Sequence, residues 1–205
     1  MTEQTQKFGQ YSLIEKLAQG GMAQVFKAKT IDANDFGRLV VIKRILPHIA
    51  ADQEYVEMLI DEAKIAVNFT HGNIAQIYDL GRVGDDDYFI VMEYVDGKTL
   101  SQIKKKLKLR KKEFPLDILL YCFIEVCHGL SYVHNKKNED GVSLGVVHRD
   151  ISPQNIILSY AGQIKIIDFG VAKAHYKKGK TESGVLKGKF AYMSPEQARS
   201  DSIDN

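Results

Sequence analysis

Hydrophobic and polar positions in the first third of the chain follow two different periods. Short segments rich in β-branched and aromatic residues predict strands at 11–17, 25–30 and 39–42, and a loop with two adjacent glycines joins the first two as in a hairpin. Between residues 52 and 69 the apolar positions recur at three- and four-residue spacing, which predicts a helix with Val56, Leu59, Ile60, Ala63 and Val67 on one face. Residues 74–80 and 88–94 predict two more strands.

After Asp96-Gly97 the pattern becomes helical. Leu116–His134 predicts a long helix, and Pro115 suits its start because the first turn needs no N–H there. Short strands are expected at 156–158 and 163–167, whereas residues 171–205 are polar with little periodicity. A β-rich part thus precedes a helix-rich part, which predicts an α+β fold with two lobes, residues 1–95 and 96–205, and a cleft between them.

Composition is that of an ordinary soluble domain, with 205 residues, 44% hydrophobic residues and a mean hydropathy of −0.22. The 28 Lys and Arg nearly balance the 26 Asp and Glu, so the whole chain has no strong attraction to nucleic acid or anionic membranes. The one strong charge block, residues 104–112, is interpreted as a solvated helix face, because no aromatic residues are interleaved as in nucleic-acid sites. We expect no nucleic-acid partner.

Several features favour the cytoplasm. Cys122 and Cys127 are expected to be buried free thiols in a reducing compartment. The first twelve residues are polar and do not resemble a secretory signal. The longest apolar run, residues 118–124, is far shorter than the roughly 20 residues that span a bilayer, so we expect no membrane segment in the chain.

Three signals for chemistry occur in a fixed order. The loop from Leu17 to Val25 has small residues that would let backbone N–H groups approach a phosphate, and Lys43 ends a buried strand; each signal is weak alone. The third signal is specific: Asp150, Asn155 and Asp168 carry oxygens that could bind a divalent cation, or Asp150 could orient a hydroxyl for attack.

These motifs together resemble the eukaryotic-like (Hanks-type) protein kinases. The resemblance rests on Lys43, His148-Arg149-Asp150, Asp168-Phe169-Gly170 and Ser194-Pro195-Glu196, and it runs from about Tyr11 to Glu196. Residues 190–197 are similar to serine/threonine rather than tyrosine kinases, and residues 148–155 look like those of bacterial members. The resemblance implies a bilobal kinase fold that uses ATP and Mg²⁺ to phosphorylate proteins.

The resemblance also implies roles for individual residues. Lys43 would hold the ATP phosphates and pair with Glu62, Asp150 would accept the proton of the substrate hydroxyl, and Asn155 and Asp168 would hold Mg²⁺. The remaining nucleotide-binding positions would be Leu17, Ala18, Gln19, Gly20, Gly21, Met22, Ala23, Val25, Val41, Met92, Glu93, Val95 and Ile157. Val25 and Ile157, with Ile42 at a position that is usually alanine, would enclose the adenine ring.

The segment between Asp168 and Glu196 is where activating phosphorylation usually falls in this family. Thr181 and Ser183 are therefore candidate autophosphorylation sites, which would involve self-association, and a solvated loop is the simpler interpretation.

The sequence departs from the family pattern at several positions. Ala18 and Ala23 stand where glycines are usual, and alanine lacks their access to positive φ. Ser152 replaces a usual lysine and Lys189 a usual threonine, so we predict that Lys189 lies near Asp150 and Ser152 and supplies the missing charge.

The chain also stops nine residues after Glu196, which predicts a truncated kinase domain that lacks the last helices of its C-terminal lobe. The apolar face of 116–134 would then be partly uncovered.

Three functions remain in consideration. A protein serine/threonine kinase fits the motifs best. A non-catalytic pseudokinase or an inactive fragment is the alternative, and a small-molecule kinase is disfavoured by Ser194-Pro195-Glu196. The resemblance also suggests a later membrane helix, which would place the domain at the cytoplasmic face of a membrane.

Overall fold

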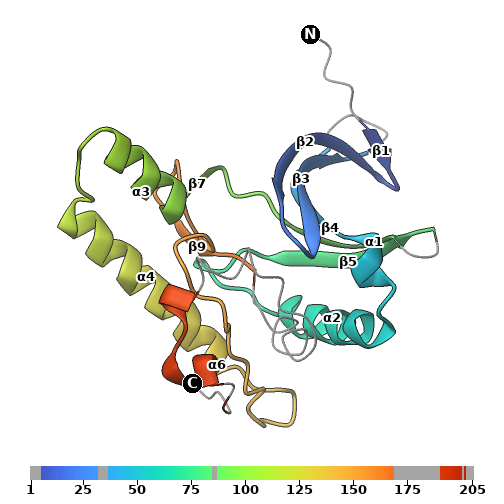
Figure 1. The fold of residues 1–205 in the computed structure, drawn as a ribbon. Coiled ribbons are helices and arrows are strands. Elements are labelled where there is room, and N and C mark those ends of the chain that lie inside the picture. Colours follow the sequence, from blue (N-terminus) through green and yellow to red (C-terminus); the bar gives the residue numbers. More distant parts are fainter. Residues whose placement is uncertain (1–5, 32–36, 85–86, 169–189, 200, 202–205) are drawn as a thin grey trace. The chain divides into compact units, whose positions relative to one another are not determined.

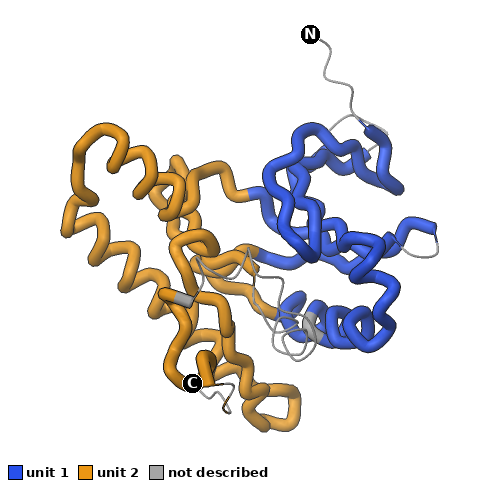
Figure 2. The backbone as a smooth tube through the Cα atoms, viewed as in Figure 1, with its two compact units in different colours: residues 1–68, 76–94 blue, residues 69–75, 95–205 orange. Residues whose placement is uncertain are grey.

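The computed structural model describes residues 6–31, 37–84, 87–168, 190–199 and 201. The chain forms two compact units, one made of residues 1–68 and 76–94 and the other of residues 69–75 and 95–205 (Figure 2). The segment 69–75 is an exception to a simple division along the sequence, because it groups with the second unit although it connects two elements of the first.

The first unit is built on a six-stranded antiparallel sheet with the order β1-β2-β3-β4-β6-β5 (Figure 1). Its strands are β1 (Gln6–Phe8), β2 (Tyr11–Gln19), β3 (Ala23–Thr30), β4 (Leu39–Ile45), β5 (Ile77–Val83) and β6 (Asp87–Glu93). A short helix α1 (Pro47–Ala50) leads into α2 (Gln53–Ala66), whose N-cap Asp52 accepts a hydrogen bond from the Tyr55 N–H at 3.2 Å.

One face of this sheet is closed by an apolar cluster. Phe8, Tyr11 and Phe89 pack edge to face with ring centroids 5.1–5.8 Å apart, and Ile42 and Val40 are buried beneath them. Side chains two residues apart in a strand point to the same face of the sheet. Val40 and Ile42 of β4 therefore point into this core, and Val41 and Lys43 lie on the opposite face.

The second unit combines a three-stranded sheet with helices. Its strands β7 (Gly97–Thr99), β8 (Ile156–Ser159) and β9 (Ile164–Ile166) pair antiparallel in that order. Its helices are α3 (Leu100–Leu109), α4 (Leu116–His134), the 3₁₀ turn η2 (Phe190–Tyr192) and α6 (Pro195–Arg199). Gly97 is required by close packing, because a Cβ there would lie 2.4 Å from the Leu158 carbonyl oxygen.

Helix α4 buries one side and exposes the other. Cys122, Val126, Gly129 and Val133 face the interior, at helical spacing, and the cluster of Cys122, Val126, Ile156, Ile164 and Ile166 forms the core of this unit. Leu116, Leu120, Phe123 and Ile124 are more than half exposed, so the expected uncovered apolar face is observed.

One expectation about α4 is wrong. Among the helices that the structure describes, α4 alone is long and apolar enough to cross a membrane by length and composition, a test that core helices of soluble domains also meet. Cys122 is a buried free thiol and burial raises its pKa, but Cys127 is exposed.

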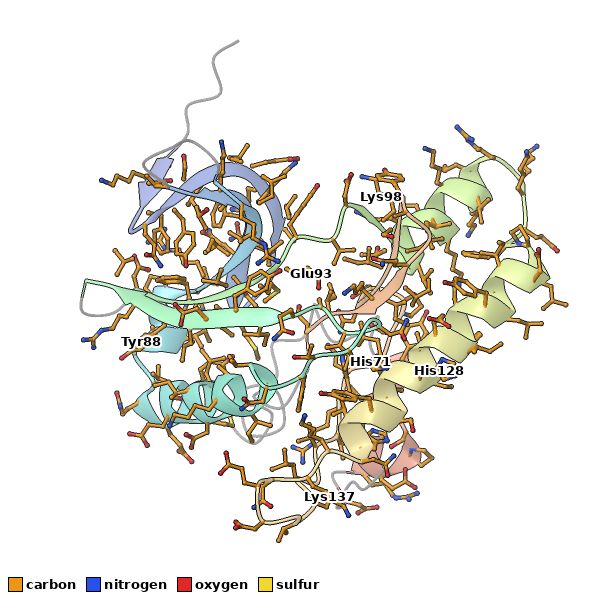
Figure 3. All side chains as sticks on the ribbon, turned by 180° about the vertical axis from the view of Figure 1, so that it is seen from behind. His71, Tyr88, Glu93, Lys98, His128 and Lys137 are labelled. Atoms are coloured by element: carbon orange, nitrogen blue, oxygen red, sulfur yellow. The ribbon has the colours of Figure 1, made fainter. Side chains whose placement is uncertain are left out.

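The segment 69–75 is fixed to α4 and β9 by polar and aromatic contacts. The Asn73 side-chain amide donates to Glu125 Oε2 at 2.7 Å and to the Ile164 carbonyl at 3.1 Å. The His71 ring, which lies beside α4 in Figure 3, stacks on Tyr132 with the centroids 5.0 Å apart. The Tyr132 hydroxyl accepts hydrogen bonds from the Thr70 N–H and Lys136 Nζ, each at 3.1 Å. These contacts explain why the segment belongs to the second unit.

Candidate functional site

In the first unit, strand register gathers four predicted site residues on one face of the sheet. Val25 of β3 is directly opposite Lys43 of β4, and Val41 is directly opposite Met92 of β6. Directly paired residues share a face, and so do residues two apart, so Val25, Val41, Lys43 and Met92 form one surface. The expectation for Ile42 is wrong: it is fully buried on the opposite face, in the aromatic core.

The loop between β2 and β3 leaves open space beside its glycines. Leu17, Ala18 and Gln19 end β2, residues 20–22 make the turn, and Ala23 begins β3. A Cβ on Gly21 would meet no atom within 4 Å, and one on Gly20 would only reach a carbonyl oxygen at 4.0 Å. Packing within the protein therefore does not require these glycines, and the open space fits a ligand that approaches the backbone.

Ala18 and Ala23 are compatible with this loop. Both lie in strands, and neither has the positive φ for which glycine would be needed. The concern that alanine lacks access to positive φ does not apply at these two positions.

Lys43 is half-buried on β4, whereas the side chain of Glu62 lies outside the described part of the structure. The backbone of α2 places residue 62 between Leu59 and Ala66, which are both buried. The Lys43–Glu62 pair remains a prediction.

In the second unit, Asn155 holds Asp150 in place. Its side-chain amide donates to the Asp150 carbonyl at 2.8 Å and to Asp150 Oδ2 at 2.9 Å, and its own N–H donates to the Ser152 carbonyl. Asn155 is buried, so these bonds are shielded from water. Because the side-chain NH₂ group is used inside the loop, the side-chain oxygen Oδ1 of Asn155 is the atom that can bind a ligand.

His148 connects the same loop to the residue before Asp168. The buried imidazole accepts the Asp150 N–H at Nδ1, at 3.2 Å, and its Nε2 lies 3.2 Å from the Ile167 carbonyl oxygen. Acceptance at Nδ1 and donation at Nε2 together correspond to the neutral ring. The Ile167 N–H in turn donates to the Asn155 carbonyl at 2.9 Å, so both loops are fixed to each other.

Two residues of these loops adopt a strained backbone. Arg149 and Asp168 have φ of 61° and 56°, and left-handed conformations cost L-residues roughly 1–2 kcal/mol each. The hydrogen bonds of His148 and Asn155 hold the neighbouring residues on both sides. Strain that is retained in this way is common where side chains must be aimed at a substrate.

Gln197, which the sequence analysis did not identify as a site residue, supports the strained loop from α6. Its Nε2 donates to the Arg149 carbonyl at 2.7 Å, while its Oε1 accepts the Ser194 N–H and its N–H donates to Ser194 Oγ. Ser194 and Gln197 thus form a capping box that also docks on Arg149. The Ser-x-x-Gln spacing was a signal for this role.

The remaining predicted residues lie at separate places. Met92 and Glu93 end β6 in the first unit, where the Glu93 N–H donates to the Gln76 carbonyl at 2.8 Å, and Val95 belongs to the second unit. Ile157 is half-buried on β8. Three predicted residues lie outside the described part of the structure: Lys189, Thr181 and Ser183. That Lys189 lies near Asp150 and Ser152 and supplies the missing charge therefore remains a prediction. Within the described part, Ser152 Oγ and Arg149 Nε are buried without a hydrogen-bond partner.

The oxygen donors of Asn155 and Asp168 suit Mg²⁺. This ion binds one or two protein oxygens and completes its shell with water and substrate phosphates. Among the described residues, no group of three or more His, Cys, Asp or Glu side chains is placed to hold a metal, so no all-protein cage is found there.

The fold and these loops are those of a protein kinase. Residues 11–205 match the protein kinase domain family, and the chain belongs to that family. The crystal structure of a single-residue mutant of the PknI kinase domain of Mycobacterium tuberculosis has the same fold, with a TM-score of 0.71, 24% identity and coverage of 98% of this chain and 69% of that chain.

Two curated relatives narrow the similarity to bacterial kinases. The chain is 46% identical to "Tyrosine-protein kinase MasK" of Myxococcus xanthus, over 97% of this chain and 31% of that protein. It is 37% identical to "Serine/threonine-protein kinase PrkC" of Bacillus subtilis, over 93% of this chain and 27% of that protein. The chain therefore spans about a third of the length of the relatives that it matches.

Proposed function

We propose that the protein is a protein kinase that transfers the γ-phosphoryl group of ATP to serine and threonine hydroxyls of protein substrates, with Mg²⁺. The observation that carries the proposal is the Asp150–Asn155 pair at 2.9 Å, in a loop that His148 fixes to the residue before Asp168. The presence of Lys43, Asp150, Asn155 and Asp168 disfavours a pseudokinase.

Asp150 would orient the acceptor hydroxyl. One of its carboxylate oxygens is occupied by the Asn155 amide, which fixes the orientation of the carboxylate. A carboxylate held in this orientation can accept the proton of a serine or threonine hydroxyl as that hydroxyl attacks. Positioning of this kind contributes more than covalent chemistry in phosphoryl transfer.

Nucleotide binding would involve the shared sheet face of the first unit. Val25, Val41 and Met92 provide apolar surface for the adenine ring, and Lys43 on the same face provides a cation for the phosphates. Asn155 and Asp168 would hold Mg²⁺, which would neutralise phosphate charge. We place this reaction in the cytoplasm, which the two free cysteines support.

Tyrosine is the second candidate acceptor. The relative named as a tyrosine-protein kinase is 46% identical, against 37% for a relative named as a serine/threonine-protein kinase. Ser152, at the position where the serine/threonine family usually has lysine, adds to this candidate.

Phosphoamino acid analysis separates these functions. The protein is incubated with γ-labelled ATP, Mg²⁺ and a mixed protein acceptor, and Asp150→Asn is the matched control. We expect label on serine and threonine that disappears in the control. Label on tyrosine alone would establish the second candidate, and ATP binding without any transfer would establish a pseudokinase and contradict the proposal.

A further inference from the structure

Residues 97–112 form a strongly basic surface outside the candidate site. They contain eight of the chain's 28 Lys and Arg and none of its 26 Asp and Glu, so the rest of the chain has a net charge of −6. We call this set the basic surface; its members are Lys98, Lys104, Lys105, Lys106, Lys108, Arg110, Lys111 and Lys112. All eight side chains are exposed, and no ion pair within the described residues joins any of them to a carboxylate. Lys98, which belongs to β7, is labelled in Figure 3.

The fold of α3 does not depend on these cations. The helix has a Thr99–Gln102 capping box, and Leu100 packs against the core of the second unit while Ile103 and Leu107 are half-buried. Its apolar side is thus already used inside the protein. The four lysines from 104 to 108 point in directions about 100° apart per residue, so they cover a broad sector and not a narrow stripe.

Lys111 retains a positive charge where glycine would fit the backbone better. Its φ is 52°, its N–H donates to the Lys108 carbonyl at 3.1 Å, and the Lys112 N–H donates to the Leu107 carbonyl at 3.0 Å. These two bonds define a Schellman motif with Lys111 at the left-handed position that glycine usually occupies. Attraction to the helix dipole explains cations in the last turn of α3, but it does not favour lysine over glycine at a strained position.

The composition of the basic surface favours a partner whose negative charge is spread over a wide area. Seven of the eight cations are lysines, which are strongly hydrated point charges, whereas arginine is enriched where proteins recognise one another. The absence of aromatic residues disfavours single-stranded nucleic acid. Leu109 and Leu116, beside the last cations, are 78% and 69% exposed and offer apolar side chains for insertion between headgroups.

We propose that the basic surface binds an anionic phospholipid membrane. Clusters of four to eight Lys and Arg on an amphipathic helix are typical of binding to phosphatidylserine-rich leaflets. The net charge of −6 on the rest of the chain would be repelled by the same leaflet, so the contact also selects one orientation.

The proposal is tested by sedimentation with vesicles of phosphatidylcholine, alone or mixed with phosphatidylserine. We expect binding to the mixed vesicles only, weakened by added salt. The triple variant Lys104→Gln, Lys105→Gln, Lys108→Gln should bind roughly a hundredfold more weakly, at about fivefold per lysine. The control Lys7→Gln, Lys64→Gln, Lys137→Gln removes three exposed lysines elsewhere and should bind as the unmodified protein does.

Lys111→Gly provides a readout that a structural role cannot reproduce. It relieves the left-handed backbone, so its midpoint of thermal unfolding should rise while its vesicle affinity falls about fivefold. Equal binding to pure phosphatidylcholine would assign the contact to the apolar face of α4 and overturn the proposal. Equal losses in the two triple variants, or equally tight binding to a polyglutamate peptide, would also overturn it.

Discussion

The two units present their candidate site residues by different physical means. In the first unit the register of β3, β4 and β6 places Val25, Val41, Lys43 and Met92 on one face without any special contact. In the second unit side-chain to backbone hydrogen bonds hold loops that have no regular structure. A substitution of a side chain on the sheet face should therefore leave the positions of its neighbours unchanged. A substitution of a side chain that holds a loop by hydrogen bonds should also displace the residues bonded to it.

The largest effect is expected for Asn155→Ala in the second unit. It removes both bonds to Asp150 and leaves a buried loop unsatisfied, so turnover should fall about 10²–10⁴-fold and the free energy of unfolding by about 1–3 kcal/mol. Asn155→Asp keeps a ligand oxygen but places a second carboxylate against Asp150, and it should lose similar turnover. Steady-state kinetics and urea unfolding measure both quantities. Turnover of Asn155→Ala within a few-fold of normal would contradict the positioning role.

The two units also differ in what their glycines do. A Cβ at Gly97 would lie 2.4 Å from the Leu158 carbonyl oxygen, so Gly97→Ala should lower the free energy of unfolding by about 1–3 kcal/mol. A Cβ at Gly21 meets open space, so Gly21→Ala should leave stability nearly unchanged and weaken nucleotide binding. Thermal unfolding with and without Mg-ATP separates the two. A strongly destabilised Gly21→Ala would show that the loop glycine has a structural role.

A smaller effect is expected where α6 supports the loop that contains Asp150. Gln197→Ala removes the capping box and the bond to the Arg149 carbonyl, and should cost about 0.5–2 kcal/mol of stability. Gln197→Glu keeps an acceptor for the cap and loses only the donor to Arg149. If docking matters for catalysis, both variants should reduce turnover, but only Gln197→Ala should be clearly less stable. Normal turnover in Gln197→Glu would limit the residue to capping.

The smallest effect concerns pH. Burial raises the pKa of Tyr132, but the hydrogen bonds from Thr70 and Lys136 outweigh it and lower the pKa below its ordinary value of 10.0. The unfolded state then binds more protons between the two pKa values, so the stabilisation is present above pH 10 and is lost as pH falls through the folded pKa. The unfolding free energy of the normal protein, relative to Tyr132→Phe, should rise with pH over that window. A difference that is flat with pH would exclude the effect.

The sequence predicted the first unit better than the second. Segments rich in β-branched and aromatic residues predicted most strands of the large sheet. The roles that the motifs gave to Lys43, Asp150, Asn155 and Asp168 stay predictions. Ile42 was misassigned because a continuous apolar run does not show which face each residue takes.

The short elements β7 and α6 were missed because they depend on contacts between residues distant in sequence, such as Gly97 against β8 and Gln197 against Arg149. The anchoring of 69–75 to α4 has the same origin, since the Asn73 contacts have no local signal.

The division between binding and chemistry is tested most directly by isothermal titration of Mg-ATP into two variants. Lys43→Met changes the sheet face of the first unit and should lose most affinity while remaining folded. Asp150→Asn changes the loop of the second unit and should keep near-normal affinity although it transfers no phosphoryl group. Unchanged affinity in Lys43→Met, or lost affinity in a folded Asp150→Asn, would contradict the assignment of nucleotide binding and phosphoryl transfer to these two regions.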